Sequence, residues 1–296
     1  MQILQYLING VSIGAVYAII ALGYTMVYGI AKMLNFAHGD VIMVGAYISF
    51  CVTNYLGLPA VVSILVAMVV CTVLGILIEG LAYKPLRGTP SLAVLITAIG
   101  VSYLLQNTAT YVTGGQPMTY PAIALLTRTV DIAGTPTKLV VIITPFLVLA
   151  LIVLLTQLIN HTKIGMAMRA VSKDFETSRL MGIKINKVIS TTFIIGSALA
   201  VVGSILYFTT YPAITPTAGA MPGLKSFVAA VFGGIGSIPG AVIGAFLIGI
   251  CETIIKGLPS EWNVSVFSDA FTFALLIIIL TCKPTGLFGE KATDKV

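Results

Sequence analysis

Charged residues are scarce in this sequence. Asp, Glu, Lys and Arg together make up 9% of the 296 residues, whereas soluble domains carry about 25%. Apolar residues make up 58%, and the mean hydropathy is +1.06. A chain of this composition cannot cover a water-facing surface, so a soluble fold is excluded and an integral membrane protein is expected.

The sequence also lacks the motifs of catalysis and cofactor binding. It contains no Gly-x-x-x-x-Gly-Lys-Ser/Thr loop, so it is not itself an ATPase, and no nucleophile, base and oxyanion set is recognisable. The four cysteines have neither metal-ligand nor redox spacing and are interpreted as small buried hydrophobes. We therefore expect no enzymatic activity, no metal and no cofactor bound by this chain.

Ionisable side chains are missing from the centres of the apolar segments. Glu79, Glu252, Lys256 and Asp269 all lie near segment ends. Carriers driven by protons or sodium usually have carboxylates near the bilayer midplane. This pattern disfavours such a carrier and indicates that another subunit supplies the energy.

What the sequence does contain is a series of apolar runs, most of them near the roughly 20 residues that a bilayer requires. They predict an all-α integral membrane protein, a polytopic bundle of 8–9 transmembrane helices in a single domain over residues 1–296. The run at 223–234 is too short to cross fully, so we expect a short or re-entrant helix there. The predicted segments are 4–30, 40–54, 59–82, 92–112, 139–159, 188–211, 223–234, 238–257 and 265–282.

The basic residues lie between the apolar runs and form no single patch, so nucleic acid is not an expected partner. If residues 160–187 are cytoplasmic, twelve of the 16 basic residues fall on that side. The positive-inside rule then predicts, for an odd number of crossings, an external N-terminus and a cytoplasmic C-terminus. The residues left on or near the external side are Arg128, Lys138, Lys225 and Lys256.

A polar turn separates the first two predicted segments. Its candidate residues for a helix turn or a transport pathway are Asn35, His38, Gly39 and Asp40. We expect a tight turn, with Asp40 capping the following helix. The close His38 and Asp40 also fit a metal site or a proton relay, but no further ligands complete such a set, which makes the turn the better interpretation.

The basic segment 162–187 contains the signals of a short helix. Ser172 or Asp174 can cap a helix that runs to about Met181, and Gly182 can end it in the left-handed conformation. A capped helix in a loop is a rigid element on which another protein can dock. From the residues alone, a docking helix and a solvated basic loop that only fixes the membrane topology are equally open.

A second break in the chain is rich in glycine. Its candidate residues are Gly233, Gly234, Gly236 and Gly240, with Pro239 among them. Such a run forbids a continuous helix, so the chain must turn sharply. The turn could expose backbone groups to a permeating ligand, or it could simply close a compact helical hairpin.

Three separated stretches resemble the high-affinity branched-chain amino-acid permeases of the LivH type, and the likeness runs over nearly the whole chain. The first is Asn-Gly-Val-Ser-Ile-Gly-Ala-Val-Tyr-Ala at 9–18, followed by the polar turn at 35–40. The second is Gly-Met-Ala-Met-Arg-Ala at 165–170, followed by Asp174 and Leu-Met-Gly-Ile at 180–183. The third is the glycine turn at 233–241.

The resemblance implies an importer in the bacterial inner membrane, built from two homologous permease subunits, two ATPase subunits that use ATP and Mg, and an external substrate-binding protein. It implies transport of leucine, isoleucine and valine by alternating access. It also gives residues 160–187 the role of a cytoplasmic coupling loop that docks on the ATPase. The loop residues implied in coupling are Gly165, Arg169, Ala170, Asp174, Leu180, Gly182 and Ile183.

Two alternatives stay open at this stage. Close relatives resemble this chain while handling urea or short amides, and an external binding protein does much of the selecting in such systems. A stand-alone channel or secondary carrier is less favoured, because the carboxylates expected near the midplane of a carrier are missing.

Overall fold

The computed structural model describes residues 2–123, 126–132, 135–258, 264–283 and 285–289. Lys291 and Lys295, which contribute to the predicted cytoplasmic charge, lie outside this part of the chain. The helices are α1 (Gln2–Ala31), α2 (His38–Asn54), α3 (Ala60–Leu77), α4 (Ser91–Thr113), α5 (Leu139–His161), α6 (Lys163–Lys173), α7 (Phe175–Leu180), α8 (Ile185–Thr210), α9 (Ala220–Gly233), α10 (Ile238–Lys256) and α11 (Ser268–Cys282).

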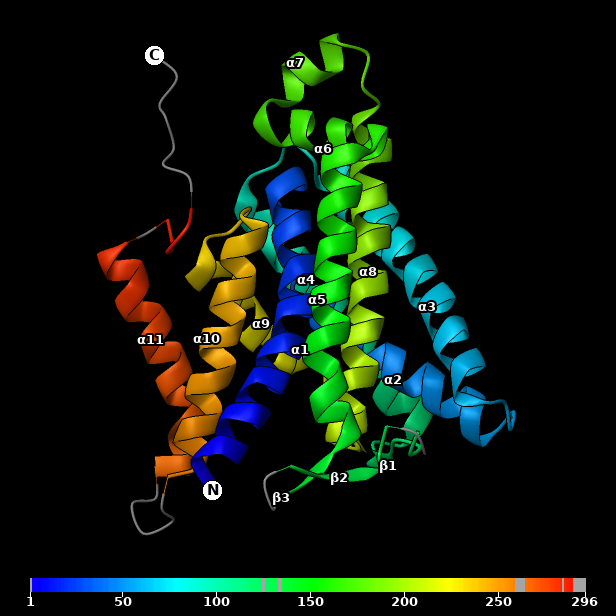
Figure 1. Cartoon of the computed structure of the whole chain (residues 1–296). Helices are drawn as coiled ribbons and strands as arrows, with labels where there is room; N and C mark the ends of the chain where they lie inside the picture. The colour runs from blue at the N-terminus through cyan, green and yellow to red at the C-terminus, as the bar shows by residue number, and fades with distance from the viewer. Residues whose placement is uncertain (1, 124–125, 133–134, 259–263, 284, 290–296) are drawn as a thin grey trace.

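The described residues form a helical bundle, as the apolar runs predict (Figure 1). Within the described residues, six helices are long and apolar enough to cross a membrane, and α9 and α11 are shorter apolar helices. The protein is therefore a polytopic, mainly α-helical membrane protein. The expected short helix at 223–234 is confirmed by α9, which has 14 residues.

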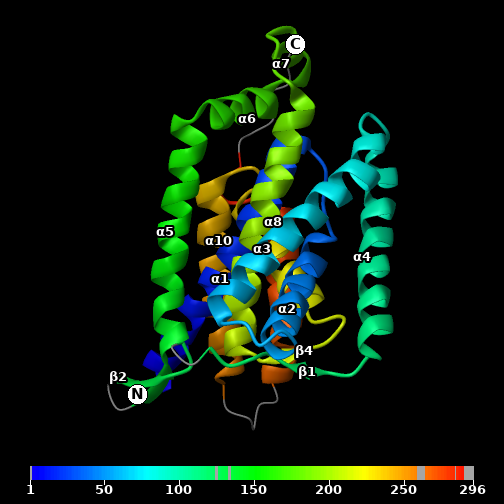
Figure 2. The same ribbon diagram turned by 90° about the vertical axis from the view of Figure 1, so that its right-hand side faces the viewer.

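Helix α1 forms the centre of the bundle, packed against α10, α8, α5 and α9. Its most apolar stretch is 94% buried, whereas that of α4 is only 11% buried. Figure 2 shows α4 and α5 standing apart on opposite sides, with α3 crossing between them. The apolar outer faces of these three helices suit contact with lipid or with another membrane subunit.

The contact between α1 and α10 depends on glycine. A Cβ added to Gly14 would lie 2.9 Å from the Cα of Phe246, and a Cβ on Gly249 would run into the backbone of Gly14. Small residues let two helix backbones approach closely, which favours association where lipid offers no hydrophobic driving force.

Two short helices, α2 and α9, begin inside the bundle and meet at their N-terminal ends. A Cβ on Gly39 would lie 2.8 Å from the carbonyl oxygen of Gly219, and a Cβ on Gly223 would lie 2.6 Å from the Cα of Gly39. Residues 38–43 are buried. The polar turn at 35–40 is thus an internal feature of the bundle.

The end of α3 departs from regular α-helix. It continues as a π-helical segment, η1 (Ile78–Tyr83), and a 3₁₀ turn, η2 (Lys84–Leu86). Within it Glu79 is buried, and it accepts hydrogen bonds from Ser190 Oγ at 2.8 Å and from Arg87. These contacts join the end of α3 to the start of α8.

Two small antiparallel strand pairs supplement the helices, and the sequence patterns did not predict them. Strands β2 (Thr129–Ile132) and β3 (Thr135–Lys138) form one pair, and β1 (Met118–Thr119) and β4 (Ala213–Ile214) form the other. Both pairs lie at the end of the bundle opposite α6 and α7, as does the N-terminus (Figure 1). A further 3₁₀ turn, η4 (Val264–Phe267), precedes α11.

Candidate functional site

The polar turn is held by side-chain hydrogen bonds, as expected, but Asp40 does not cap α2. The helix begins at His38, and its N-cap residue, Ala37, makes no side-chain cap. Asp40 is the third residue of the helix, and its Oδ1 accepts a hydrogen bond from Gln106 Nε2 at 2.9 Å. The capping prediction was wrong because the N-cap is Ala37, three residues before Asp40. Asn35 Oδ1 accepts from the Tyr83 hydroxyl at 3.0 Å.

His38 is a buried packing residue in this structure. It is 2% exposed, and its ring meets that of Tyr24 edge to face at 4.7 Å between centroids. A Cβ added to Gly23 would run into its imidazole. Within the described residues, no three His, Cys, Asp or Glu side chains gather as a metal site would require.

Helix α6 turns sharply from the end of α5, and polar contacts fix this angle. The Thr162 hydroxyl accepts from the amide of Gly165 at 3.0 Å and so caps α6. Arg169 Nη1 donates to the carbonyl of Ile159 at 2.9 Å and to Asn160 Oδ1 at 3.0 Å. A Cβ on Gly165 would overlap the Ile159 carbonyl, so only glycine permits this approach.

The predicted short helix is confirmed as α7, and Asp174 is its cap. Asp174 Oδ1 accepts from the amides of Glu176 at 2.9 Å and Thr177 at 3.2 Å. The Asp174 amide in turn donates to the carbonyl of Ala170 at 3.2 Å, which ties α7 to α6. Gly182 ends the helix at φ +80°.

The tip beyond α7 presents apolar side chains to solvent. Leu180 is 86% exposed and Met181 is 78% exposed. Ile183, directly after Gly182, turns back: its amide donates to the carbonyl of Ser178 at 3.1 Å, and its side chain packs on the core. Two exposed hydrophobic residues, Leu180 and Met181, therefore lie at the end of α7, a helix that Asp174 caps.

The predicted glycine turn joins α9 to α10. Gly234 and Gly236 have φ of +110° and +97°, values that glycine adopts without strain. The Ser237 hydroxyl accepts from the amide of Gly240 at 3.2 Å and caps α10. The C-terminal segment closes over the turn, since the Phe288 amide donates to the carbonyl of Gly233 at 2.9 Å. A compact hairpin is thus the geometry observed.

A buried charge cluster joins four helices near the other end of the bundle. Glu252 of α10 is 1% exposed, and its Oε1 accepts from Lys225 of α9 at 2.6 Å and from Lys256 at 2.5 Å. Its Oε2 accepts from the Tyr17 hydroxyl of α1 at 2.9 Å. Lys225 also pairs with Asp269 of α11 at 2.6 Å. Two cations and two anions therefore balance.

Lys225 lies within α9, in the predicted short segment 223–234, and it is buried. Its placement on or near the external side gave no indication of this burial. Its burial is compensated by two carboxylates, as a buried cation requires. One signal in the sequence could have indicated this ion pair: Lys225 is a single charged residue in an otherwise uncharged apolar run.

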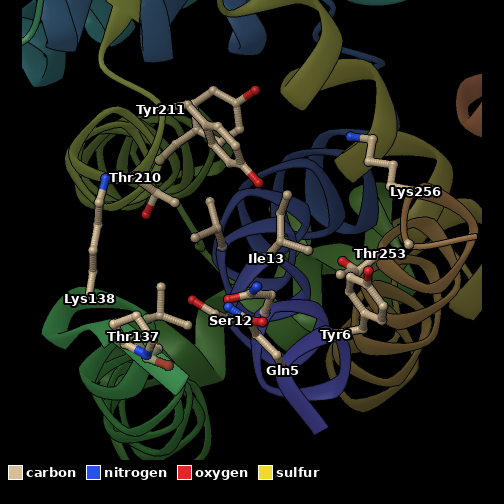
Figure 3. Close-up of a pocket in the computed structure, with 16 residues that line it drawn as sticks. Gln5, Tyr6, Ser12, Ile13, Thr137, Lys138, Thr210, Tyr211, Thr253 and Lys256 are labelled. Atoms are coloured by element: carbon tan, nitrogen blue, oxygen red, sulfur yellow. The ribbon is translucent and has the colours of Figure 1, made fainter. Parts of the chain in front are cut away.

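A cavity of about 400 Å³ adjoins this cluster, between α1, α5, α8 and α10 (Figure 3). It lies at the end of the bundle that carries the N-terminus and the strands. Lys138 and Lys256 stand on opposite walls, and Ser12 and Ile13 of α1 lie between them. Its lining residues are Gln5, Tyr6, Asn9, Ser12, Ile13, Val16, Pro136, Thr137, Lys138, Val141, Tyr207, Thr210, Tyr211, Thr253, Lys256 and Gly257.

Tyr211 lies in the cavity wall just beyond α8. Burial raises the pKa of its phenol, and the nearby Glu252 carboxylate raises it further while Lys225 opposes. The hydroxyl is therefore neutral and can donate a hydrogen bond. The cavity brings together none of the predicted candidates in the polar turn, the loop or the glycine turn, and sequence reasoning did not predict it.

Comparison with known proteins adds family evidence to this geometry. The profile of the family described as "Branched-chain amino acid transport system / permease component" matches residues 6–280. The high-affinity branched-chain amino acid transport system permease protein LivH of Escherichia coli (strain K12) is 38% identical over 308 residues, covering 100% of this chain and 98% of that protein. The corresponding protein BraD of Pseudomonas aeruginosa is 40% identical, covering 99% and 98%.

Structural similarity to solved proteins is weaker. PsaBC from Streptococcus pneumoniae, solved in complex with Fab, matches with a TM-score of 0.48 and 14% sequence identity, over 94% of this chain and 91% of that one.

Proposed function

The chain belongs to the family of branched-chain amino acid transport system permease components, and we propose that it is the membrane-spanning permease subunit of an ATP-binding-cassette importer. Its substrates are leucine, isoleucine and valine, which it moves across the bacterial cytoplasmic membrane by alternating access. The observation that carries this proposal is the 38–40% identity to two such permeases over essentially the whole chain.

The proposed assembly contains a second homologous permease, two ATPase subunits that use ATP and Mg, and an external substrate-binding protein. The chain has no phosphate-binding loop of its own, so a partner must hydrolyse ATP. The apolar faces of α3, α4 and α5 supply surface for lipid and for a neighbouring membrane subunit.

The proposed topology has nine crossings with an external N-terminus and a cytoplasmic C-terminus, and a count of eight would move the N-terminus inside. Eight of the crossings are the six long helices together with α2 and α11. The ninth is the short helix α9. Helices α6 and α7 lie on the cytoplasmic side. The distribution of basic residues supports this orientation, because the segment 160–187 carries Lys163, Arg169, Lys173, Arg179, Lys184 and Lys187.

The segment 160–187, with α6 and α7, is proposed to couple the bundle to the ATPase. Leu180 and Met181 are exposed large apolar residues on a capped helix end, and such residues suit burial in a partner groove. Arg169 ties α6 to the end of α5. A displacement of α7 by the ATPase would therefore reach the transmembrane bundle through α6.

Uptake by the reconstituted complex tests the proposal. Proteoliposomes that contain the permeases, the ATPases and the binding protein should accumulate labelled leucine, isoleucine and valine when ATP is present. The matched control replaces ATP by a non-hydrolysable analogue and should show no accumulation. Accumulation without ATP would indicate a channel or secondary carrier, and uptake of labelled urea in place of the amino acids would reassign the substrate.

A further inference from the structure

The cavity between α1, α5, α8 and α10 has a cationic lining. Lys138 and Lys256 contribute to its wall, and no Asp or Glu is among the described residues that line it. The hydroxyl and amide side chains of Asn9, Ser12 and Thr210 also line the cavity. The wall thus carries Lys138 and the half-exposed Lys256, which rests against Glu252, among several hydrogen-bonding groups, and this favours an anionic group such as a carboxylate.

We propose that this cavity binds the α-carboxylate of an aliphatic amino acid, with Lys256 as its cationic anchor. The inference rests on the proposed function and adds a substrate site to it. Some α1 residues of the charge cluster and the cavity lie in the first stretch that carries the family resemblance. The residues contributed by other elements lie outside all three stretches.

Lys256 can turn to a ligand without leaving a buried charge unpaired. Its side chain is 47% exposed, so its resting contact with Glu252 is open to water on one side. Glu252 keeps Lys225 and the Tyr17 hydroxyl as partners when Lys256 leaves. Lys225 lacks this freedom, because it is buried between two carboxylates.

The size and the remaining lining of the cavity fit the other parts of such a ligand. About 400 Å³ lies at the small end of the usual range of ligand pockets, roughly 300–1,000 Å³. Ile13, Val16 and Val141 offer an aliphatic patch for a branched side chain. Side-chain oxygens of Asn9 and Ser12 can accept hydrogen bonds from the α-ammonium group.

Thiol protection tests the site directly. The full chain, with its four native cysteines replaced by alanine, receives Thr210→Cys and is treated in right-side-out membrane vesicles with a sulfonate-bearing methanethiosulfonate. Leucine should slow the labelling, whereas leucinamide, which lacks the carboxylate, should not. The same treatment of a Tyr111→Cys chain controls for effects on the reagent, because residue 111 is 90% exposed near the end of α4 that leads to β1 and is not part of the cavity lining.

Lys256→Gln should raise the leucine concentration needed for half-protection by roughly tenfold, because one charge-assisted hydrogen bond is lost. Lys256→Arg should restore it, and Lys84→Gln, a change at the opposite end of the bundle, should leave it unchanged. Equal protection by leucinamide, or none by leucine, would overturn the site. If ATP-driven leucine uptake persists while protection is absent, only the site fails; absence of uptake counts against the proposed function instead.

Discussion

Neutralising Glu252 should destabilise the bundle far more than neutralising Lys256. In Glu252→Gln, the buried Lys225 keeps one carboxylate partner among the described residues, Asp269, whose side chain is 43% exposed. Breaking a buried ion pair costs about 3–5 kcal/mol, and the remaining carboxylate offsets part of this, so we expect a loss of roughly 2–4 kcal/mol. In Lys256→Gln, Glu252 keeps Lys225 and Tyr17, and the expected loss is about 0.5–1 kcal/mol.

Equilibrium unfolding of the purified chain in mixed micelles measures both values. The helical circular dichroism signal is followed while the mole fraction of SDS is raised, and the free energies of unfolding of the two variants are compared with that of the unmodified chain. Comparable losses for Glu252→Gln and Lys256→Gln would refute the reasoning, since they would mean that Glu252 contributes no more to stability than its half-exposed partner Lys256. A loss under about 0.5 kcal/mol for Glu252→Gln would show that the cluster does not act as a buried network.

The other predictions concern helix packing and coupling. Gly249→Ala should lower the free energy of unfolding by about 1–3 kcal/mol in the same assay, because its Cβ would overlap the backbone of Gly14; Gly100→Ala, where nothing lies within 4 Å, should cause no loss. Leu180→Ser should reduce leucine-stimulated ATPase activity of the reconstituted complex by roughly tenfold without affecting membrane insertion, whereas Val112→Ser, 75% exposed at the far end of α4, should retain it. Unchanged coupling in Leu180→Ser would argue against docking through the tip of α7.

Much of the fold follows from sequence patterns that are local. Apolar run length predicts the long helices, and short-range capping signals predict α7 from Asp174 and Gly182. The glycine turn was equally predictable, because several glycines and a proline close together prevent a continuous helix. Each of these features is decided by neighbours along the chain.

The candidate site was less predictable because its contacts are long-range. Tyr17 and Glu252 are 235 residues apart, and no pattern in either segment predicts their hydrogen bond. Lys225 was predicted on or near the external side, and its burial depends on pairing with Glu252 and Asp269, which are distant in the sequence. The predicted start of α2 was wrong because helix boundaries are hard to read from sequence, and the N-cap lies at Ala37, three residues before Asp40.

The glycine contact between α1 and α10 has a consequence for biosynthesis. Helix α1 leaves the ribosome long before α10, because Gly249, which contacts Gly14, follows it by more than 230 residues. Until then the small-residue face of α1 lacks its main partner and must be shielded by lipid or by the insertion machinery. Closure of the core is therefore a post-insertion event, and a chain that ends before α10 would leave α1 exposed to quality-control proteases.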